Sequence, residues 1–384
     1  MFTFTRIIFL VGLGLLAGCA GGPRDNSAVL VSEQNARFIE RPTEGSGPAP
    51  VVQTPPLKPI FQNTNAVLTI HSNLPPAIKL NTNAPVKIVH HPLPPTFTSL
   101  NNWAADYQLS PPTRLTGLPV VTYSISSRNG VCVLEIGSRD ATWRGMSVHL
   151  GFAPEMIDGQ IFVHGLDIIK TLSPLLVEPP PSFGPHRTIV IDPGHGGING
   201  GTVSIDGRAE KEFTLDWSRR LASLLTSSGW TVFLTRTNDS DVSLSNRVAF
   251  AESHHADLFL SLHFNSSAPD HRQSGLETYC LTPTGMPSTL TRGYADSWAD
   301  SYPNNNYDFE NLRLAARLHG ALLATGGMED RGIRRARFMG VLLGQRRPAV
   351  LIEGGYLSNK HEADKIESGE YRQKLAEALA RELR

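Results

Sequence analysis

The sequence predicts an α/β protein with a wound, mostly parallel β-sheet flanked by helices, preceded by a small β-rich domain and a disordered linker. Two observations carry this prediction. From Arg187 onward, short β-branched runs alternate with amphipathic segments, which is the pattern of a wound sheet. Before residue 113 the chain is rich in proline and asparagine and has no sustained hydrophobic periodicity. A length of 384 residues leaves room for one large domain and a smaller unit.

The charge balance and the cysteines exclude some classes of protein. The formal net charge is zero, which argues against a protein that binds nucleic acid or another polyanion. Cys19, Cys132 and Cys280 lack the spacing of a metal site. Because Cys132 and Cys280 fall in different predicted domains, we expect both of them to be free thiols.

Residues 1–19 have the pattern of an export signal. One cation, Arg6, precedes an apolar segment over 7–16 that is too short for a comfortable membrane span. The sequence LAGC that ends at Cys19 resembles the lipobox of bacterial lipoproteins, in which the cysteine is diacylated and becomes the mature N-terminus. We therefore expect an exported protein of the cell envelope that is tethered to a membrane through Cys19. The alternative is an ordinary signal peptide that is cleaved nearby.

Residues 20–112 are predicted to be a linker. The segment holds runs such as NLPPAIKLNTNAPVK and has too little apolar surface to build a core. About ninety residues would span roughly 50 Å as a flexible coil, enough to carry a folded domain away from a membrane. A short helix over Leu100–Tyr107, capped by Ser99, is expected to pack Trp103 against the domain that follows.

Residues 113–180 are predicted to form the small β-rich domain. Two strand-like runs flank Asn129-Gly130, which is a strong hairpin signal, and further glycine turns follow. A short helix over Leu166–Leu176 closes the unit. The pattern distantly resembles the copper amine oxidase N-terminal-like modules found beside cell-wall enzymes. We expect His149 in this unit to be an ordinary strand residue.

Residues 186–384 form the predicted α/β domain. Four segments have the length and composition of buried strands. They are TIVI at 188–191, WTVFLT at 230–235, ADLFLSLHF at 256–264 and PAVLIE at 348–353. Ligands of open α/β sheets bind beyond the carboxyl ends of the strands, so the residues at these ends are the candidates for a functional site.

His195 lies in a loop that is almost free of other side chains. The strand over 188–191 runs into Asp192, Pro193 and then the segment GHGGINGG, whose glycines permit positive φ and close backbone approach. This places His195 just beyond the end of a strand. The alternative is that the loop is only a tight connection.

Glu210 is the second candidate. The segment that begins with it reads as a helix with apolar residues at Phe213, Trp217 and Leu221, and Glu210 lies on the same inward face. Glu212 lies about 200° around the helix and is expected to face solvent. Because an unpaired buried carboxylate is costly, Glu210 needs a partner. A simple first-turn acid is the alternative.

His263 and Glu353 complete the set. Each ends a run that reads as a buried strand, and each is followed by loop-forming residues. Two histidines and a glutamate, His195, His263 and Glu210, at one edge of a parallel sheet are a ligand set suited to zinc, with a fourth position left for water. Glu353 at the same edge is placed to take a proton from that water.

Residues 187–384 resemble the catalytic domain of the zinc-dependent N-acetylmuramoyl-L-alanine amidases of the amidase 3 type. The motifs that carry the resemblance occur in the family's order: IDPGHGG, EKEFTL, ADLFLSLHFN, RGIRRARFMGVL and PAVLIEGGYLSN. The resemblance implies zinc ligation by His195, Glu210 and His263, and a catalytic role for Glu353. Asp192 is a further candidate, for orienting a ligand. Phe264 and Gly354 depart mildly from the family pattern.

The resemblance also implies a function. Enzymes of this family cleave the amide between N-acetylmuramic acid and L-alanine of peptidoglycan, zinc polarising the scissile carbonyl and lowering the pKa of the attacking water. A non-cleaving peptidoglycan-binding lipoprotein and a zinc peptidase acting on stem-peptide cross-links are the alternatives. The polar loop over 282–312 falls where some relatives carry a regulatory helix, and it is either a lid or a wall of the groove. A regulatory protein partner is left open.

Overall fold

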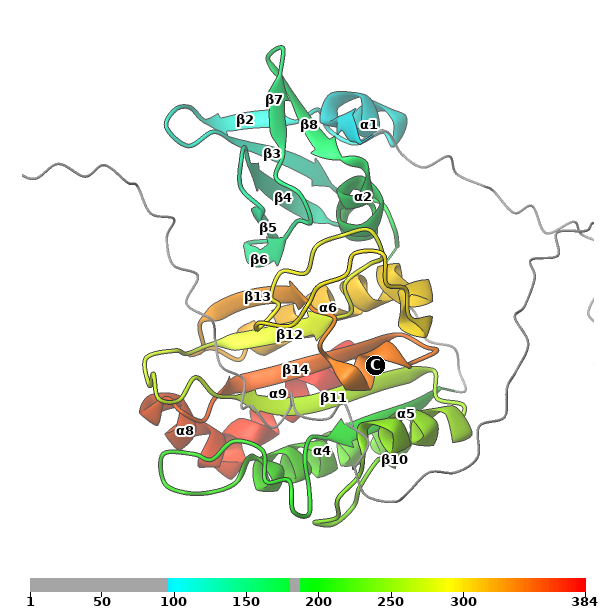
Figure 1. The fold of residues 1–384 in the computed structure, drawn as a ribbon, viewed down its shortest axis with the longest axis vertical. Coiled ribbons are helices and arrows are strands. Elements are labelled where there is room, and N and C mark those ends of the chain that lie inside the picture. Colours follow the sequence, from blue (N-terminus) through cyan, green and yellow to red (C-terminus); the bar gives the residue numbers. More distant parts are fainter. Residues whose placement is uncertain (1–95, 180–186) are drawn as a thin grey trace, which may run out of the picture.

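The fold is that of a computed structural model, which describes residues 96–179 and 187–384 (Figure 1). The predicted signal sequence, Cys19 and most of the predicted linker therefore lie outside the described residues. Among the residues that are described, no helix combines the length and the apolar character needed to cross a membrane.

The described chain is organised around one sheet of eleven strands, in the order β10-β9-β11-β14-β12-β13-β6-β5-β4-β3-β2. Six of its strands come from the second half of the chain: β9 (Thr188–Pro193), β10 (Thr231–Leu234), β11 (Leu258–Asn265), β12 (Leu276–Cys280), β13 (Asp330–Arg335) and β14 (Ala349–Tyr356). The other five come from the predicted β-rich unit: β2 (Thr113–Thr116), β3 (Thr122–Ser127), β4 (Gly130–Glu135), β5 (Asp140–Trp143) and β6 (Met146–His149).

The strand directions change across this sheet. The run β10-β9-β11-β14 is parallel, β12 is antiparallel to β14, and β12-β13-β6 is again parallel. From β6 to β2 every pairing is antiparallel. The predicted class, a wound sheet flanked by helices, is confirmed. All residues of β11 and β14 are buried, as expected for parallel strands that are covered on both faces.

Two layers of helices cover the parallel half of the sheet. One layer holds α4 (Glu210–Ser227), α6 (Asp308–Leu323) and α9 (Gly369–Glu382), and the apolar stripe of α4 at Phe213, Trp217 and Leu221 is fully buried in the larger core cluster. On the opposite face, α5 (Leu244–Ser253) and α7 (Gly340–Leu343) pack on a second cluster. A further helix, α8 (Lys360–Glu367), follows β14.

The remaining elements form a small second sheet and its helices. The sheet has the order β1-β8-β7, and the elements are β1 (Phe97–Ser99), α1 (Leu100–Asp106), β7 (Glu155–Ile157), β8 (Gln160–His164), α2 (Gly165–Asp167), a π-helical turn (Ile168–Leu172) and α3 (Ser173–Leu176). The predicted helix at 100–107 is confirmed, because the Ser99 hydroxyl accepts a hydrogen bond from the Asn102 amide and Trp103 is buried. The hairpin at Asn129-Gly130 is confirmed as the β3–β4 connection.

The N-terminal unit joins the α/β domain edge to edge. Strand β6 pairs with β13 through Val148 and Ile333, and Figure 1 shows the two strands side by side. The Ser147 amide donates to Asp330 Oδ2 over 2.7 Å, and Lys170 forms an ion pair of 3.0 Å with Asp308. The strands of the two units thus form one continuous sheet, which the sequence alone does not predict.

Cys132 and Cys280 are both buried and free, as predicted. Burial raises the pKa of the Cys132 thiol to about 12 and that of Cys280 to about 11. Thiols of this kind are unreactive because the nucleophilic form is the thiolate.

Candidate metal centre

The glycines around His195 are required by close approach. His195 itself has φ of 62°, in the left-handed region. A Cβ atom at Gly194 would lie 2.3 Å from Cε1 of His263, and one at Gly201 would lie 2.5 Å from Oε2 of Glu210. The side chains that are missing from this loop would therefore occupy the space that His263 and Glu210 fill beside His195.

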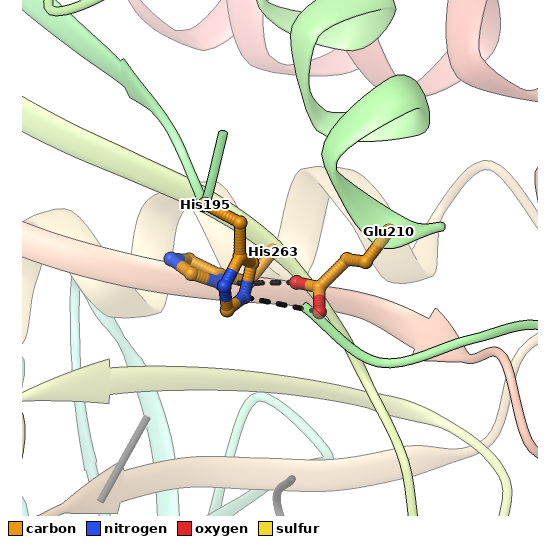
Figure 2. A group of neighbouring side chains, drawn as sticks. All are labelled: His195, Glu210 and His263. Atoms are coloured by element: carbon orange, nitrogen blue, oxygen red, sulfur yellow. Dashed lines mark hydrogen bonds and ion pairs between the residues drawn. The ribbon is translucent and has the colours of Figure 1, made fainter. Parts of the chain in front are cut away.

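The structure brings His195, Glu210 and His263 together (Figure 2). His195 comes from the loop after β9, Glu210 is the first residue of α4, and His263 lies near the end of β11. Their candidate ligand atoms all lie within 4.8 Å of one another, and all three residues are buried. Nε2 of His195 is 3.1 Å from Oε2 of Glu210, and Nδ1 of His263 is 3.0 Å from Oε1.

Backbone and amide groups hold these side chains in place. The Thr202 amide donates to Oε2 of Glu210 and the Phe264 amide to Oε1, each over 3.0 Å. Oδ1 of Asn199 accepts from the Gly201 amide and lies 3.0 Å from Nδ1 of His195. Sequence reasoning missed Asn199. It could have been found from the sequence, because it is the one residue of the GHGGINGG segment whose side-chain amide could orient the histidine.

The chemistry of the donors fits a divalent cation. Because Oδ1 of Asn199 can only accept, Nδ1 of His195 carries the proton and Nε2 presents a lone pair. Nε2 is buried and has no hydrogen-bond partner within the described part of the chain, although the Glu210 carboxylate is beside it. Two lone-pair atoms at this separation repel unless a cation lies against both. Nitrogen and carboxylate ligands of this kind are those of a zinc site.

The charge states agree with this interpretation. Burial alone would raise the pKa of Glu210, but the neighbouring rings of His195 and His263 hold it well below its usual value. Burial lowers the pKa of His263, against the opposing influence of Glu210. The cluster therefore holds a carboxylate beside a neutral imidazole at neutral pH, which is the protonation state that metal ligation requires.

Glu353 lies beside the cluster. It is the register partner of His263 in the parallel β11–β14 pair, so both side chains are on the same face of the sheet. Its carboxylate is buried, and Oε2 has no hydrogen-bond partner among the residues that the structure describes. Burial and the charge of Glu210 raise its pKa well above the usual value, while Arg292 opposes the shift. Strand β14 does not end at Glu353, as the sequence suggests, but continues to Tyr356.

Asp192 is connected to the His195 loop through Arg247. It accepts hydrogen bonds from Thr235 (2.5 Å), Ser261 (2.7 Å) and Arg247 (2.5 Å). Nη2 of Arg247 also donates to the carbonyl of His195 over 2.8 Å. Within the described chain, the hydrogen bonds of Asp192 reach the metal-ligand loop only through this arginine. Its predicted role in orienting a ligand stays a prediction.

A second buried arginine supports the same loop. Nη2 of Arg236 donates to the carbonyls of Gly194 and Lys211, each over 2.8 Å, and its Nε donates to the carbonyl of Pro193. Sequence reasoning missed Arg236 and Arg247 because arginine is mostly a surface residue. Between them the two guanidiniums bind the carbonyl groups of Pro193, Gly194 and His195 where the chain leaves β9.

The loop over 282–312 contributes to the wall of the site. Arg292 lines a cavity of about 110 Å³ together with His195, His263 and Phe338. Its Nη2 donates to the Tyr279 hydroxyl over 3.2 Å, and its guanidinium lies over the Phe338 ring. The loop therefore brings a cation to the same cavity as the histidines.

Comparison with known proteins identifies the family. Residues 189–384 match the family described as N-acetylmuramoyl-L-alanine amidase. The chain is 35% identical over 196 residues to the N-acetylmuramoyl-L-alanine amidase LytC of Bacillus subtilis, covering 50% of this chain and 34% of LytC. It is 28% identical over 218 residues to the amidase AmiA of Escherichia coli, covering 51% of this chain and 75% of AmiA.

A solved structure with a similar chain is the catalytic domain of CwlV, an N-acetylmuramoyl-L-alanine amidase from Bacillus (Paenibacillus) polymyxa. The identity is 29%, with 51% of this chain and 96% of the CwlV domain covered, and the TM-score is 0.43. The family match spans half of the chain, so this protein belongs to the N-acetylmuramoyl-L-alanine amidase family. The predicted enzyme class, a peptidoglycan amidase, is confirmed at the level of the family. The match begins after the N-terminal unit, which it does not include.

Proposed function

We propose that this protein is a zinc-dependent peptidoglycan hydrolase that cleaves the amide between N-acetylmuramic acid and L-alanine of the stem peptide. The observation that supports it most is the family match over 189–384 together with the cluster of His195, Glu210 and His263 inside the matched region. The chain spans about a third of LytC, so the activity of the whole protein is part of the proposal.

His195, Glu210 and His263 would hold the zinc ion. Glu210 supplies the negative charge, and two backbone amides keep its carboxylate between the histidines. When bound, zinc polarises a substrate carbonyl and lowers the pKa of water at the site. Asn199 keeps the His195 ring in the tautomer that leaves Nε2 free to bind.

Glu353 would move the proton. Its carboxylate accepts a proton from the attacking water and returns it to the nitrogen of the leaving L-alanine. Burial and the charge of Glu210 raise its pKa above the usual value of a carboxyl group, which is the direction that favours a group that both accepts and releases a proton. Its unpartnered Oε2 leaves one oxygen for this exchange.

Digestion of purified cell wall tests the reaction. Mass spectrometry of the soluble products is expected to show stem peptides with a new free amino group on L-alanine and glycan strands that carry intact lactyl groups. Cuts confined to the peptide cross-links would replace the proposal with a zinc peptidase. Binding of the wall without any cut would replace it with a non-cleaving binding protein.

We also propose that the mature protein is an exported lipoprotein of the cell envelope. Four parts follow the sequence prediction: a signal over 1–19 with lipidation at Cys19, a linker over 20–112, a small domain over 113–180 and the amidase domain over 186–384. The end of the predicted linker differs from this division, because β1 and α1 pack with the small domain. The lipobox-like LAGC sequence supports the lipid anchor.

Cys19→Ser tests the anchor. Because the diacylglycerol on Cys19 would supply most of the attachment, we expect the variant to be soluble or to remain unprocessed. The measurement is immunoblotting of membrane and soluble fractions, with the size of the band reporting signal removal. A variant that loses its signal sequence and still sediments with the membrane would show that another anchor exists.

A further inference from the structure

The cavity at the metal cluster is too small to hold a whole substrate. Its volume is about 110 Å³, whereas sites that enclose a small molecule usually measure about 300–1,000 Å³. The amide that reacts can enter a space of this size, but the groups attached to it cannot. The rest of the substrate therefore has to lie on a surface that adjoins the cavity.

A larger groove adjoins this cavity. Its volume is about 840 Å³, and it shares the wall residues Leu244, Phe338 and Gly340 with the cavity that contains His195. The groove follows α5 from Leu244 to Glu252, a rise of about 12 Å along the helix axis. Its other walls are α7 and the second half of the 282–312 loop. A ligand in the groove can thus reach into the metal cavity past Phe338.

Aromatic rings line this groove. Tyr294 and Tyr302 of the 282–312 loop are both half-buried in its wall. The Tyr294 ring stacks on Phe338, with 5.9 Å between the ring centroids and 21° between the ring planes. A tyrosine ring combines an apolar face with a hydroxyl group at its rim. A pyranose ring has the same two parts, C–H faces and a polar rim, so the two kinds of surface match.

Buried interactions hold this wall in place. Arg337 pairs with Asp296, and its Nη2 donates to the carbonyl of Met286 over 2.8 Å. Nη2 of Arg139, in the N-terminal unit, donates to the carbonyl of Ser288 over 3.2 Å. The loop therefore presents its tyrosines from a fixed position, which reduces the entropy that is lost when a ligand binds.

The other wall residues favour a neutral ligand that is not a peptide. The charged side chains in the wall are two acids, Glu252 and Asp300, and two arginines, Arg337 and Arg346, so neither sign dominates. No strand residue lines the groove within the described chain, so an extended peptide finds no strand edge there to pair with. A glycan strand is neutral wherever the lactyl carboxyl group of its muramic acid is still held in an amide.

We propose that this groove binds the glycan strand next to the muramoyl residue whose lactyl amide enters the metal cavity. The ligand class is a neutral, N-acetylated oligosaccharide, and a disaccharide unit has the size that the groove can hold. Tyr294 and Tyr302 contact the sugar rings, and Phe338 lies at the junction with the metal cavity. This inference rests on the proposed amidase function and adds a saccharide subsite formed by α5, α7 and the 282–312 loop.

Binding of a peptide-free sugar tests the groove without catalysis. The probe is chitotetraose, a neutral oligosaccharide of N-acetylglucosamine, titrated calorimetrically into the full chain. Tyr302→Leu keeps apolar volume but removes the ring, and it is expected to weaken binding about tenfold. Tyr302→Phe keeps the ring and is expected to stay within about twofold of the parent. Tyr107→Leu, at an exposed tyrosine that caps α1, is the matched control and leaves the affinity unchanged.

A second variant tests the opposite wall of the groove. Ala249 is exposed on α5 and lines the groove. Ala249→Leu fills part of the groove with an alkyl group that offers neither a ring nor a hydrogen bond, and it is expected to weaken chitotetraose binding about fivefold. A parent protein that does not bind chitotetraose overturns the proposal, as does equal affinity in the parent, Tyr302→Leu and Ala249→Leu.

A free stem peptide separates a sugar site from a peptide site. A synthetic stem tetrapeptide, titrated in the same way, is expected to give the same result with the parent, Tyr302→Leu and Ala249→Leu. A loss of peptide affinity in these variants, with chitotetraose affinity unchanged, would show that the groove takes the peptide and would overturn the proposal.

Kinetics distinguishes the groove from the reaction itself. The substrates are glycan strands that carry stem tetrapeptides and a single N-acetylmuramoyl tetrapeptide without a neighbouring sugar. The ratio of kcat/KM on the strand to kcat/KM on the single unit is expected to fall about tenfold in Tyr302→Leu, through a higher KM on the strand, and to keep its parental value in Tyr107→Leu. A parent enzyme that cuts neither substrate contradicts the amidase function. A parent that cuts both, with the same ratio in Tyr302→Leu, contradicts only the groove.

Discussion

The two halves of the central sheet differ in how far their polar side chains are buried and hydrogen-bonded. In the parallel half, Asp192 is fully buried and bonded to three protein donors, while Oε2 of Glu353, beside the metal cluster, has no hydrogen-bond partner among the described residues. In the antiparallel half, one face is apolar core and the other lines a polar cavity, whose wall includes Glu135, His149 and Arg334. Strands covered on both faces must pair their polar groups within the protein, whereas strands with one open face can leave them to water.

The backbone near the metal cluster is held by more buried hydrogen bonds than the side chains at the polar cavity. Arg236 and Arg247 fix the backbone of the His195 loop with hydrogen bonds to its carbonyls. A metal site needs such support because ligand positions must be held closely. At the cavity, Asp140 is largely exposed and pairs with the His149 ring, so this acid is held less closely than Asp192.

The largest effect is expected at the three residues that are proposed to bind zinc. His195→Ala or His263→Ala should lose both bound zinc and activity, because each removes one of three ligands. The sheet should still fold, since the site lies at its rim. Elemental analysis measures the zinc and circular dichroism checks the fold. His361→Ala, on the exposed surface of α8, is the control and should keep its zinc. Stoichiometric zinc in either ligand variant would show that the ligand assignment is wrong.

A smaller effect is expected at the cavity, from His149. Burial and the charge of Arg334 lower the pKa of His149 from 6.5 to about 4, while Asp140 opposes the shift. Between these values the unfolded chain binds a proton that the folded protein does not, so the free energy of unfolding falls as the pH is lowered from about 6.5 to about 4. The loss from this group is up to roughly 3 kcal/mol.

Urea denaturation at several pH values measures this contribution. His149→Gln removes the titrating group and should flatten the dependence on pH between 4 and 6.5 relative to the parent protein. The difference between the two proteins isolates His149 from the carboxylates that titrate in the same range. Parallel pH profiles would mean that the His149 ring titrates as it does in the unfolded chain.

The candidate site could be predicted because its information is local. His195, His263 and Glu353 each follow a run of strand residues, and the edge of a parallel sheet brings such positions together. Glu210 is found from the helix periodicity of Phe213 and Trp217. These arguments need only short stretches of sequence, so they remain valid without knowledge of the full topology.

The continuity of the sheet could not be predicted, because it does not depend on local sequence. It depends on one bridge, Val148 to Ile333, between short strands far apart in the chain. Strand β13, with the sequence DRGIRR, is too polar to read as a strand. The structure explains why a strand can contain Arg331 and Arg334, because both form ion pairs with Glu277 of the neighbouring strand. Arg236 and Arg247 were missed for a similar reason, because the carbonyl groups that they bind belong to the His195 loop, far from either arginine in the sequence.

Glu353→Gln tests the central claim most directly. The change keeps the size and hydrogen-bonding capacity of the side chain but removes its ability to accept a proton at neutral pH. Zinc should stay bound through His195, Glu210 and His263, and wall fragments should still bind. The rate of wall cleavage should fall by about 10²–10⁴-fold, the usual cost of losing a general base.

The matched control is Glu212→Gln, two residues after Glu210 on the exposed face of α4, where the acid pairs with Arg208. This variant should cleave wall at the parental rate. The measurement is the initial rate of release of stem peptides from purified wall, with zinc content determined on the same samples. A large loss in Glu353→Gln at full zinc occupancy, with Glu212→Gln unchanged, is the predicted result. Cleavage by Glu353→Gln at the parental rate, or loss of activity in Glu212→Gln alone, would contradict the account.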